Sequence, residues 1–348
     1  MENIRLNVSL LRKRVPNLTR EARAVGLRPA TVSNLCTGKI PIERAEIKTL
    51  VALSVLADCS LDELIIRDEN GELIEIGIKT IDLFAPLITG GTVGLVARPG
   101  MGQLVVLGEV LHRLKKNKNC MVLLLKPQGD YPEISDITNN VDIIAASIEE
   151  AYKVTIDLGA DTKIVLAADR SHVITREIYK LQERLKKVGI NYVSTFLVDL
   201  KGEAVDVDLP YGPLETLWQF DANLAARGKY PAINPLYSTS TILEGEFTNH
   251  DHFVIQQKAK KLIRRYRELR SLVNVNGKDK LPGLEKQTYI IGERLEAYLT
   301  QPLYVAEEVS GKKGVNVNLL DTLTDVRKIL DKKYDERNIS ELEYIGRY

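Results

Sequence analysis

A glycine-rich stretch, 97–104, has the residue types and spacing that could bind phosphate. It reads Ala-Arg-Pro-Gly-Met-Gly-Gln-Leu and follows the apolar run Val93 to Val96. Backbone N–H groups of such a turn, with the positive end of a following helix, form a cradle for phosphate oxygens. A working phosphate-binding loop reads G-x-x-x-x-G-K-[ST], in which Lys reaches the β- and γ-phosphates and the hydroxyl holds Mg²⁺. The stretch predicts a strand, a turn and a helix in this order.

Three positions of that pattern are changed. Ala97 stands at the first Gly, while Gln103 and Leu104 stand where Lys and Ser/Thr belong. Arg98 lies inside the loop and could replace the missing charge, because a guanidinium binds phosphate well. The pattern indicates a loop that keeps its glycines, Gly100 and Gly102, but has lost its cationic hook and its metal ligand.

Composition is ordinary for a globular protein. The 348 residues suffice for two or three domains, with 44% hydrophobic and 27% charged residues. No signal peptide is evident, and no apolar run approaches the roughly 18 residues of a membrane helix. The three cysteines are widely spaced, which favours a reducing compartment over disulfide or metal chemistry. We therefore expect a cytoplasmic protein without membrane contact.

The N-terminal part is basic. Residues 1–48 hold ten Lys/Arg and four Asp/Glu, a charge of +6 in a chain whose total is +1. Two short helical patterns, 18–26 and 27–38, each end at a glycine, which is typical of a helix-turn-helix. Pro29 fits the first turn of the second helix. A helical protein-interaction domain with a basic face is the alternative.

This segment resembles the Cro/C1-type helix-turn-helix family. Thr31-Val-Ser-Asn-Leu35 matches the core of its recognition helix, Gly38-Lys39 its closing pair, and 45–57 and 60–64 its last helices. We expect Val32 and Leu35 to be buried, although Thr31 or Ser33 could be internal caps. Cys36 replaces the family's usual Glu, so no sequence preference carries over. The residues expected to contact double-stranded DNA are Arg20, Arg28, Thr31, Ser33, Asn34 and Lys39.

After a polar linker at 68–71, apolar runs alternate with helical patterns. The runs are 92–96, 121–125, 141–145, 163–168 and 192–198, and the helices include 103–116, one opened by a Ser147–Glu150 capping box, and 173–188. Such alternation predicts a parallel sheet covered on both faces. Beyond an expected exposed turn at His250 and His252, the pattern is helical, with further helices at 285–300 and 318–331.

The stretch 253–272 has one apolar face and an opposite side with seven Lys/Arg between Lys258 and Arg270. A solvated helix face explains these charges better than a nucleic-acid contact.

Three segments in the same order resemble the β subunit of the rotary F-type ATP synthase, with the transcription terminator Rho as a cousin. They are Gly77–Pro86, Tyr230–Ser240 and Gln301–Glu307, while Met121–Leu125 is closer to the Rho strand. The resemblance covers about 72–330. It implies a RecA-like α/β core with a degenerate P-loop at 72–245 and a C-terminal helical bundle at 246–348, behind an all-α helix-turn-helix domain at 1–67. The fold class expected is thus multidomain, α and α/β.

The resemblance also places functional residues. Asp169 matches the family's Walker B aspartate and Tyr230 its base-stacking tyrosine, but Lys126-Pro-Gln128 stands where the catalytic Glu belongs, and Thr241 where an arginine belongs. Because hydrolysis needs a metal, charge stabilisation and an oriented water, we expect a pseudo-ATPase with no required cofactor. ATP or ADP binding stays open. It would involve Arg98, Pro99, Gly100, Met101, Gly102, Gln103, Leu104, Asp169 and Tyr230.

These features together predict a DNA-binding transcriptional regulator whose inactive ATP-synthase-like part serves oligomerisation and, if nucleotide binds, sensing. The resemblance implies rings of six, which would raise avidity for repeated DNA sites. The alternative is an active or weak hexameric ring ATPase or nucleic-acid translocase that uses Arg98 and Asp169.

Overall fold

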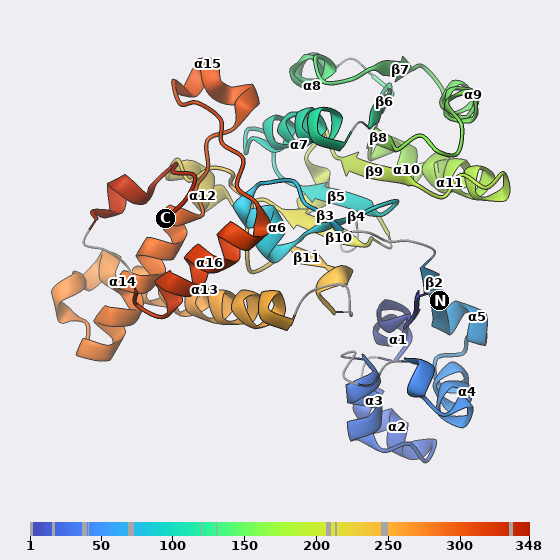
Figure 1. Cartoon of the computed structure of the whole chain (residues 1–348), viewed down its shortest axis with the longest axis horizontal. Coiled ribbons are helices and arrows are strands. Elements are labelled where there is room, and N and C mark those ends of the chain that lie inside the picture. Colours follow the sequence, from blue (N-terminus) through green and yellow to red (C-terminus); the bar gives the residue numbers. More distant parts are fainter. Residues whose placement is uncertain are drawn as a thin grey trace. The chain divides into compact units, whose positions relative to one another are not determined.

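The computed structural model (Figure 1) describes residues 3–15, 18–36, 40, 42–68, 73–118, 120–129, 131–206, 210–212, 214–244, 250–333 and 337–348. The chain divides into two compact units. The first consists of 1–72 and 241–249, and the second of 73–240 and 250–348. The division into three domains at 1–67, 72–245 and 246–348 stays a prediction.

The first unit, in its described part, packs short helices and a two-stranded sheet around one apolar core. Its elements are β1 (Asn3–Leu6), α1 (Val8–Arg14), α2 (Leu18–Ala24), α3 (Pro29–Cys36), α4 (Ile47–Leu56), α5 (Leu61–Leu64) and β2 (Ile65–Asp68). Leu11, Val32 and Leu53 are fully buried in the core. The antiparallel pair β1–β2 was not predicted, and Asp68 of the expected linker ends β2, while 69–71 lie outside the described residues.

The second unit is built on a seven-stranded sheet in the order β11-β10-β5-β9-β8-β6-β7. Its strands are β5 (Thr92–Val96), β6 (Met121–Leu125), β7 (Ile143–Ala145), β8 (Ile164–Asp169), β9 (Val193–Val198), β10 (Thr216–Gln219) and β11 (Thr239–Ser240). All neighbours are parallel except β10 and β11. A small antiparallel pair, β3 (Leu73–Ile74) and β4 (Leu87–Ile88), precedes the sheet.

Helices cover both faces of this sheet, as the continuous apolar runs predict (Figure 1). α7 (Gln103–Lys118) packs on one face, where Leu107 and Leu111 belong to the same apolar core as Leu95 of β5. α9 (Ile148–Leu158) and α11 (Glu177–Lys187) pack on the other, where Leu181 belongs to the same apolar core as Leu166 of β8. The shorter helices are α8 (Ser135–Thr138), α10 (Ser171–Ile174) and α12 (Ala222–Ala226). The expected mostly parallel α/β architecture is confirmed.

The C-terminal part is helical, as expected, with α13 (His250–Asn276), α14 (Gly283–Tyr298), α15 (Glu307–Ser310) and α16 (Leu319–Leu330). Ile263, Leu295 and Val326 form the centre of their core. α6 (Lys79–Phe84) is buried throughout and joins this core to that of the sheet, since Ile81 packs in the sheet core while Phe84 packs among the helices.

Three local predictions are wrong. The helix expected at 173–188 is broken at Arg176, whose φ of +60° is left-handed. Ser147 caps α9, but the Glu150 carboxylate accepts from the N–H of Ala146 at 2.8 Å and not from the cap residue, so the capping box is incomplete. His252 is not in an exposed turn. It is 1% exposed within α13 and donates to the Leu83 carbonyl across 3.0 Å.

Candidate nucleotide site and helix-turn-helix

The glycine-rich stretch forms the expected connection from β5 to α7. Gly100 and Gly102 have φ of +83° and +81°, a left-handed conformation that glycine adopts without steric cost. Space around Gly100 is open, because a Cβ there would meet no atom within 4 Å. The backbone geometry therefore keeps the turn of a phosphate-binding loop.

The two substituted side chains at the start of α7 point into the protein. Gln103 is 7% exposed and Leu104 9%, and Leu104 belongs to the apolar core on the α7 face of the sheet. A lysine and a hydroxyl at these positions would face a phosphate and its metal. Here those positions serve packing, so the loop presents no cationic hook and no hydroxyl ligand from α7.

Arg98 is the cation that remains in the loop. Its Nη2 lies 3.3 Å from Oδ1 of Asp206, and both side chains are more than half exposed. Exposed pairs of this kind contribute little stability, about 0–1 kcal/mol, so Arg98 can exchange partners. The segment after β9 also contacts the loop at Pro99, since a Cβ on Gly202 would lie 2.4 Å from the Pro99 Cδ.

The predicted Walker B residue, Asp169, ends β8 and is 4% exposed. Its Oδ2 accepts from the N–H of Ser171 at 2.9 Å, and its Oδ1 accepts from the N–H of Leu200 at 3.1 Å. The carboxylate thus joins the ends of β8 and β9. In the sheet, β9 lies between β8 and β5, the strand that leads into the loop. β8 and β5 are therefore about 10 Å apart.

Two charged residues at the same edge were missed by sequence reasoning. Asp199, directly after β9, accepts from the N–H groups of Lys201 and Ala204. Arg170, directly after β8, lies 3.8 Å from the Asp199 carboxylate and 3.4 Å from that of Glu203. A polar residue immediately following a buried strand is the signal that could have found both.

Tyr230 and the loop are brought together by the fold. The Tyr230 ring is 36% exposed, and its Cε1 lies 3.6 Å from the Cβ that Gly102 would carry. The backbone N–H of Tyr230 donates to the Tyr344 hydroxyl at 3.2 Å. Leu303 is buried, whereas Val309 is 94% exposed. Tyr230 is therefore positioned beside the loop.

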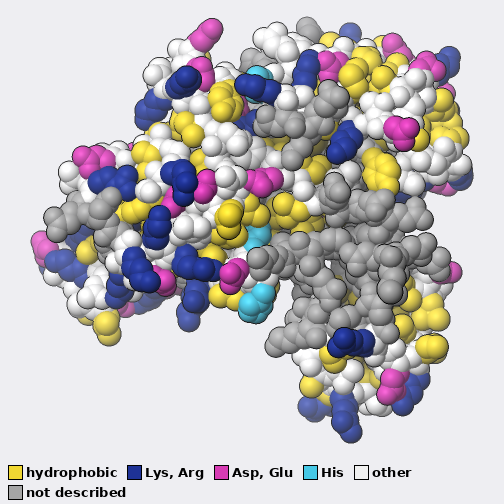
Figure 2. All heavy atoms as spheres, viewed as in Figure 1, with side chains coloured by type: hydrophobic (Ala, Val, Ile, Leu, Met, Phe, Trp, Pro, Cys, Tyr) yellow, Lys and Arg dark blue, Asp and Glu magenta, His cyan; other side chains and the backbone are white. Residues whose placement is uncertain are grey.

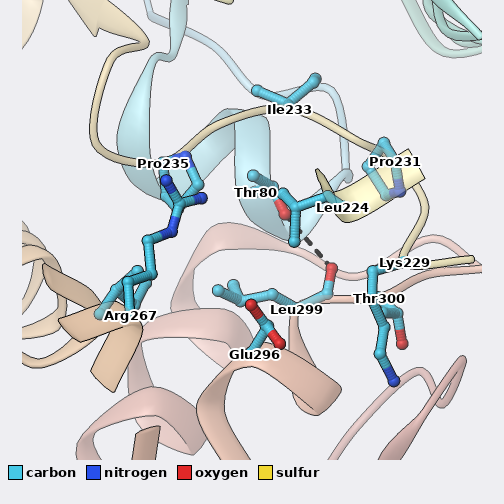
Figure 3. A pocket seen from close by; sticks show the side chains of 11 residues that line it. Thr80, Leu224, Lys229, Pro231, Ile233, Pro235, Arg267, Glu296, Leu299 and Thr300 are labelled. Carbon is cyan, nitrogen blue, oxygen red and sulfur yellow. Dashed lines mark hydrogen bonds between the residues drawn. The ribbon is translucent and has the colours of Figure 1, made fainter. Parts of the chain in front are cut away.

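A small cavity lies behind the Tyr230–Ser240 segment, against α13 and α14 (Figure 3). It is lined by Thr80, Leu224, Lys229, Pro231, Ile233, Pro235, Ile263, Arg267, Glu296, Leu299 and Thr300. Its volume of about 20 Å³ has room for a water molecule but not for a nucleotide. A larger cavity of about 390 Å³ is lined by His112, Lys116, Tyr304 and their neighbours. Neither contains a residue of the loop.

The segments with family resemblance meet around Gln301. Its Oε1 accepts from the N–H of Lys79 at 2.9 Å, and its own N–H donates to the Tyr230 carbonyl at 3.0 Å. Gln301 is 1% exposed. These residues therefore have a structural role that does not depend on nucleotide chemistry.

In the first unit, α2 and α3 are joined by the turn 25–28. Gly26 has a φ of +74°, and the N–H of Leu27 donates to the Ala22 carbonyl at 2.9 Å. Pro29 begins α3, as expected. Val32 and Leu35 are buried at 0% and 5% exposure, so the inward face of the helix is as predicted.

The predicted DNA-contacting residues divide by exposure. Arg20, Arg28 and Ser33 are exposed, and Thr31 and Asn34 are partly buried. Lys39 lies outside the described residues. The α2–α3 pair therefore presents basic and polar side chains on its outer surface, and their contact with DNA stays a prediction.

The basic side of α13 is largely engaged within the protein. Lys and Arg side chains gather over this helix (Figure 2). Arg265 pairs with Glu285, Arg267 with Asp221 at 2.8 Å, and Arg270 with Glu296 at 3.1 Å. Arg267 and Arg270 are mostly buried in these pairs, so this side of α13 is only in part the solvated face that was expected.

Over the described ranges, no helix is both long and apolar enough to cross a bilayer. The same ranges contain no group of three His, Cys, Asp or Glu side chains that could hold a metal ion.

Comparison with known proteins supports part of the expected relation. Residues 242–339 match the family described as the C-terminal domain of V and A type ATP synthase. A solved structure of a unique ATP synthase subunit, NeqB from Nanoarcheaum equitans, is similar to this chain with a TM-score of 0.56. Sequence identity is 14%, over 77% of this chain and 78% of that one, so this likeness concerns the fold alone. The similarity to ATP synthase thus extends over 242–339 in sequence and, beyond that, to the fold. Its relation to the F-type β subunit and to Rho in particular stays a prediction.

Proposed function

We propose that this chain is a DNA-binding regulator whose ATP-synthase-like unit does not hydrolyse ATP and serves as a scaffold for assembly. The observation that carries the proposal is the burial of Gln103 and Leu104, at 7% and 9% exposure, where a hydrolysing loop needs a Lys and a hydroxyl. Asp169 adds support, because both of its oxygens accept backbone hydrogen bonds.

Loss of several electrostatic groups leaves no turnover. Removing one such group typically lowers a rate by about 10²–10³, and here the lysine and the metal hydroxyl are both replaced. We expect no phosphate release from Mg-ATP in a malachite-green assay of the full chain, with or without duplex DNA. Turnover that disappears in Arg98→Ala would overturn the proposal and favour the alternative of a ring ATPase or translocase.

A second candidate function, nucleotide sensing, is favoured by the contact between Tyr230 and Gly102. A base on Tyr230 and phosphates at the loop would use both residues, and Arg98 is free to exchange Asp206 for a phosphate. ADP should then raise the melting temperature of the full chain, and Tyr230→Ala should reduce this increase. Tyr237→Ala is the control, because Tyr237 is an exposed tyrosine of the same segment. ADP should raise the melting temperature of this variant as much as that of the unchanged chain. No shift at millimolar ADP would exclude sensing at this loop.

The DNA-binding part of the proposal rests on the exposed Arg20, Arg28 and Ser33 of the α2–α3 pair. We expect the full chain to bind a fluorescein-labelled mixed-sequence duplex with an affinity that falls steeply with salt. Arg28→Ala should weaken binding by about 1–3 kcal/mol if it reads a base, or lower the salt slope by about 1 if it holds a phosphate.

Lys261→Ala is the matched control, because Lys261 is an exposed cation on α13. Its affinity for the duplex should equal that of the unchanged chain. An equal loss in both variants would mean that binding is a general property of surface charge. Absence of binding at low salt would contradict the DNA-binding proposal directly.

The last part of the proposed function is assembly of the chain with copies of itself. A structurally similar protein is an ATP synthase subunit, and we propose that this chain associates with copies of itself, in a ring or another closed form. Sedimentation velocity of the full chain over a concentration series would report the assembly, and a single monomer species throughout would contradict it.

A further inference from the structure

The second unit contains a polar cavity of about 390 Å³ beside the C-terminal half of α7. The turn Tyr304–Ala306, which leads into α15, packs against α7 there (Figure 1). Pockets for small molecules measure about 300–1,000 Å³, so the space is large enough for a small ligand. We call it the α7 cavity. Its lining side chains are polar, namely Glu75, His112, Arg113, Lys116, Tyr304 and Asn316.

Arg113 fixes two walls of the α7 cavity. Its side chain is 2% exposed and donates to the Gly77 carbonyl at 2.8 Å, to Oδ1 of Asn316 at 3.0 Å and to the Val315 carbonyl at 2.8 Å. The segments before α6 and before α16 are thereby held against α7. Because these walls are already in place, a ligand would not have to order them on binding, which favours affinity.

The acidic side chains near the α7 cavity already have partners. The Glu109 carboxylate lies 2.6 Å from Nε of Arg113 and also accepts from a backbone N–H group. Asp82 is buried and accepts from two backbone N–H groups. One oxygen of Glu75 accepts from the N–H of Leu319, at the beginning of α16, where the positive end of the helix dipole favours a carboxylate. None of these acids forms an ion pair with Lys116 in the described part of the chain.

Lys116 is a cation of the α7 cavity without an acidic partner among the described residues. Its side chain is exposed, and its ammonium lies 5.5 Å from the centroid of the Tyr304 ring. His112 lies one helical turn earlier, with its ring centroid 5.8 Å from that of Tyr304. Nδ1 of His112 donates to Oδ1 of Asn140 at 3.3 Å, so Nε2 is the ring nitrogen left for a ligand. A lysine, a histidine and a tyrosine therefore meet around one open space.

The helix dipole alone does not explain this arrangement. Basic side chains near the end of a helix balance the negative end of its dipole, and Lys115 of the same turn can do so while it pairs with Asp142. The dipole accounts neither for the polar space next to Lys116 nor for the Tyr304 ring beside it. An unbalanced ammonium at the edge of a preformed polar cavity indicates an anionic ligand.

We propose that the α7 cavity binds a small organic phosphate that carries hydroxyl groups. Its oxyanion contacts the ammonium of Lys116 and Nε2 of His112, because an ammonium and a protonated imidazole both donate to phosphate oxygens. Its hydroxyl groups contact the second oxygen of Glu75 and the hydroxyl of Tyr304. An apolar ligand does not suit this lining, since polar groups would lose water without gaining hydrogen bonds. The proposal does not depend on DNA binding, on assembly or on nucleotide binding at the glycine-rich loop.

Isothermal titration calorimetry of the full chain tests this site, with inorganic phosphate and ribose 5-phosphate as probes and ribose as the uncharged comparison. Both phosphates should bind, ribose 5-phosphate more tightly, and ribose should not. Lys116→Gln should weaken the binding of ribose 5-phosphate at least about tenfold, because a hydrogen bond to a charged group is lost. Its circular dichroism spectrum should stay unchanged, since Lys116 is exposed. Tyr304→Phe keeps the ring, removes the hydroxyl and should weaken binding by a smaller factor.

Lys115→Gln is the matched control, because it removes the same charge from the neighbouring residue of α7, whose ammonium pairs with Asp142. Arg98→Ala removes the cation of the glycine-rich loop. Both variants should bind ribose 5-phosphate like the unchanged chain. A loss in Arg98→Ala with none in Lys116→Gln would place the ligand at the loop and overturn the proposal. Equal losses in Lys115→Gln and Lys116→Gln, or no binding of either phosphate at millimolar concentration, would also overturn it.

Discussion

The side-chain amide of Gln301 donates a hydrogen bond of 2.7 Å to the carbonyl of Gly77, a residue 224 positions earlier in the chain. The same amide donates to the Val315 carbonyl, also at 2.7 Å. Gly77 itself cannot carry a Cβ, because one would lie 1.9 Å from Oδ1 of Asn316. The segments with ATP synthase resemblance are thus joined at a fully buried polar contact.

Gln301→Ala should be strongly destabilising. It would leave the buried N–H of Lys79 without its partner, at about 1–3 kcal/mol, and would remove one of the donors to the carbonyls of Gly77 and Val315, which keep the Arg113 guanidinium. We expect a loss of at least about 2 kcal/mol in urea unfolding. Gln287→Ala, on an exposed side of α14, is the control and should change the free energy of unfolding by less than about 0.5 kcal/mol. Similar losses in both would contradict the structural role of Gln301.

A buried ion pair in α7 allows a second prediction. Nε of Arg113 lies 2.6 Å from the Glu109 carboxylate, with both side chains at most 1% exposed. The Arg113 guanidinium also donates to the carbonyls of Gly77 and Val315, each at 2.8 Å. Glu109→Gln leaves this cation uncompensated and should lower the free energy of unfolding by about 3–5 kcal/mol.

An exposed ion pair with the same spacing in the sequence serves as the control. Glu183 and Lys187 of α11 are also four residues apart, at 2.9 Å, but are 68% and 71% exposed. Glu183→Gln should change the free energy of unfolding by less than about 0.5 kcal/mol. A loss below about 1 kcal/mol in Glu109→Gln would show that the buried arginine finds other compensation.

Lys79 should make stability increase with pH above neutrality. Burial lowers the pKa of Lys79 from 10.5 to about 7, an effect that the nearby Asp325 carboxylate opposes. Between these values the unfolded chain binds more protons than the folded one, so the free energy of unfolding rises with pH. The slope is at most about 1.4 kcal/mol per pH unit for one proton.

Urea unfolding at about pH 7, 8 and 9 measures how the free energy of unfolding changes with pH. Lys79→Met should abolish the rise, and Lys187→Met, at an exposed site, should preserve it. The measurement starts at neutral pH because of Asp82, whose pKa burial raises to about 7. Below that value Asp82 makes the free energy of unfolding fall as pH rises, which would oppose the effect of Lys79. A flat profile in the unchanged chain would contradict the prediction.

Some of this structure was accessible from local sequence and some was not. The strands 92–96 and 121–125 coincide with continuous apolar runs, since a parallel strand covered on both faces must be apolar on both sides. β10 was missed because it has four residues, with Thr216 and Gln219 beside the buried Trp218. The helix break at Arg176 was missed because no glycine or proline in the local sequence indicates it.

The candidate site shows the same division. The loop and the substitutions at Gln103 and Leu104 follow from the motif, but their burial depends on the packing of α7 against the sheet. The local sequence around His252 predicts an exposed polar turn, yet His252 donates to the Leu83 carbonyl, 169 residues earlier. Contacts of this range are set by tertiary packing and leave no local pattern.

The last prediction concerns the contact between the loop and the segment after β9. Gly202 has a φ of +74°, and its Cβ would lie 2.4 Å from the Pro99 Cδ. Gly202→Ala therefore combines backbone strain with a clash against a proline ring that cannot rotate away. Gly189→Ala carries similar strain, with a φ of +82°, but no atom lies within 4 Å of its Cβ.

The difference between the two variants isolates the clash. Strain alone costs about 1–2 kcal/mol, so Gly189→Ala should lose about that amount, and Gly202→Ala should lose a further 1–3 kcal/mol or displace the loop. Urea unfolding gives the two energies, and hydrogen exchange of the amides at 98–102 reports the displacement. Because the clash acts on Pro99, which has no N–H of its own, faster exchange is expected at the flanking amides of Arg98 and Gly100 to Gly102 in Gly202→Ala and not in Gly189→Ala. Equal stability and equal exchange in both would mean that the segment after β9 does not hold the loop in place.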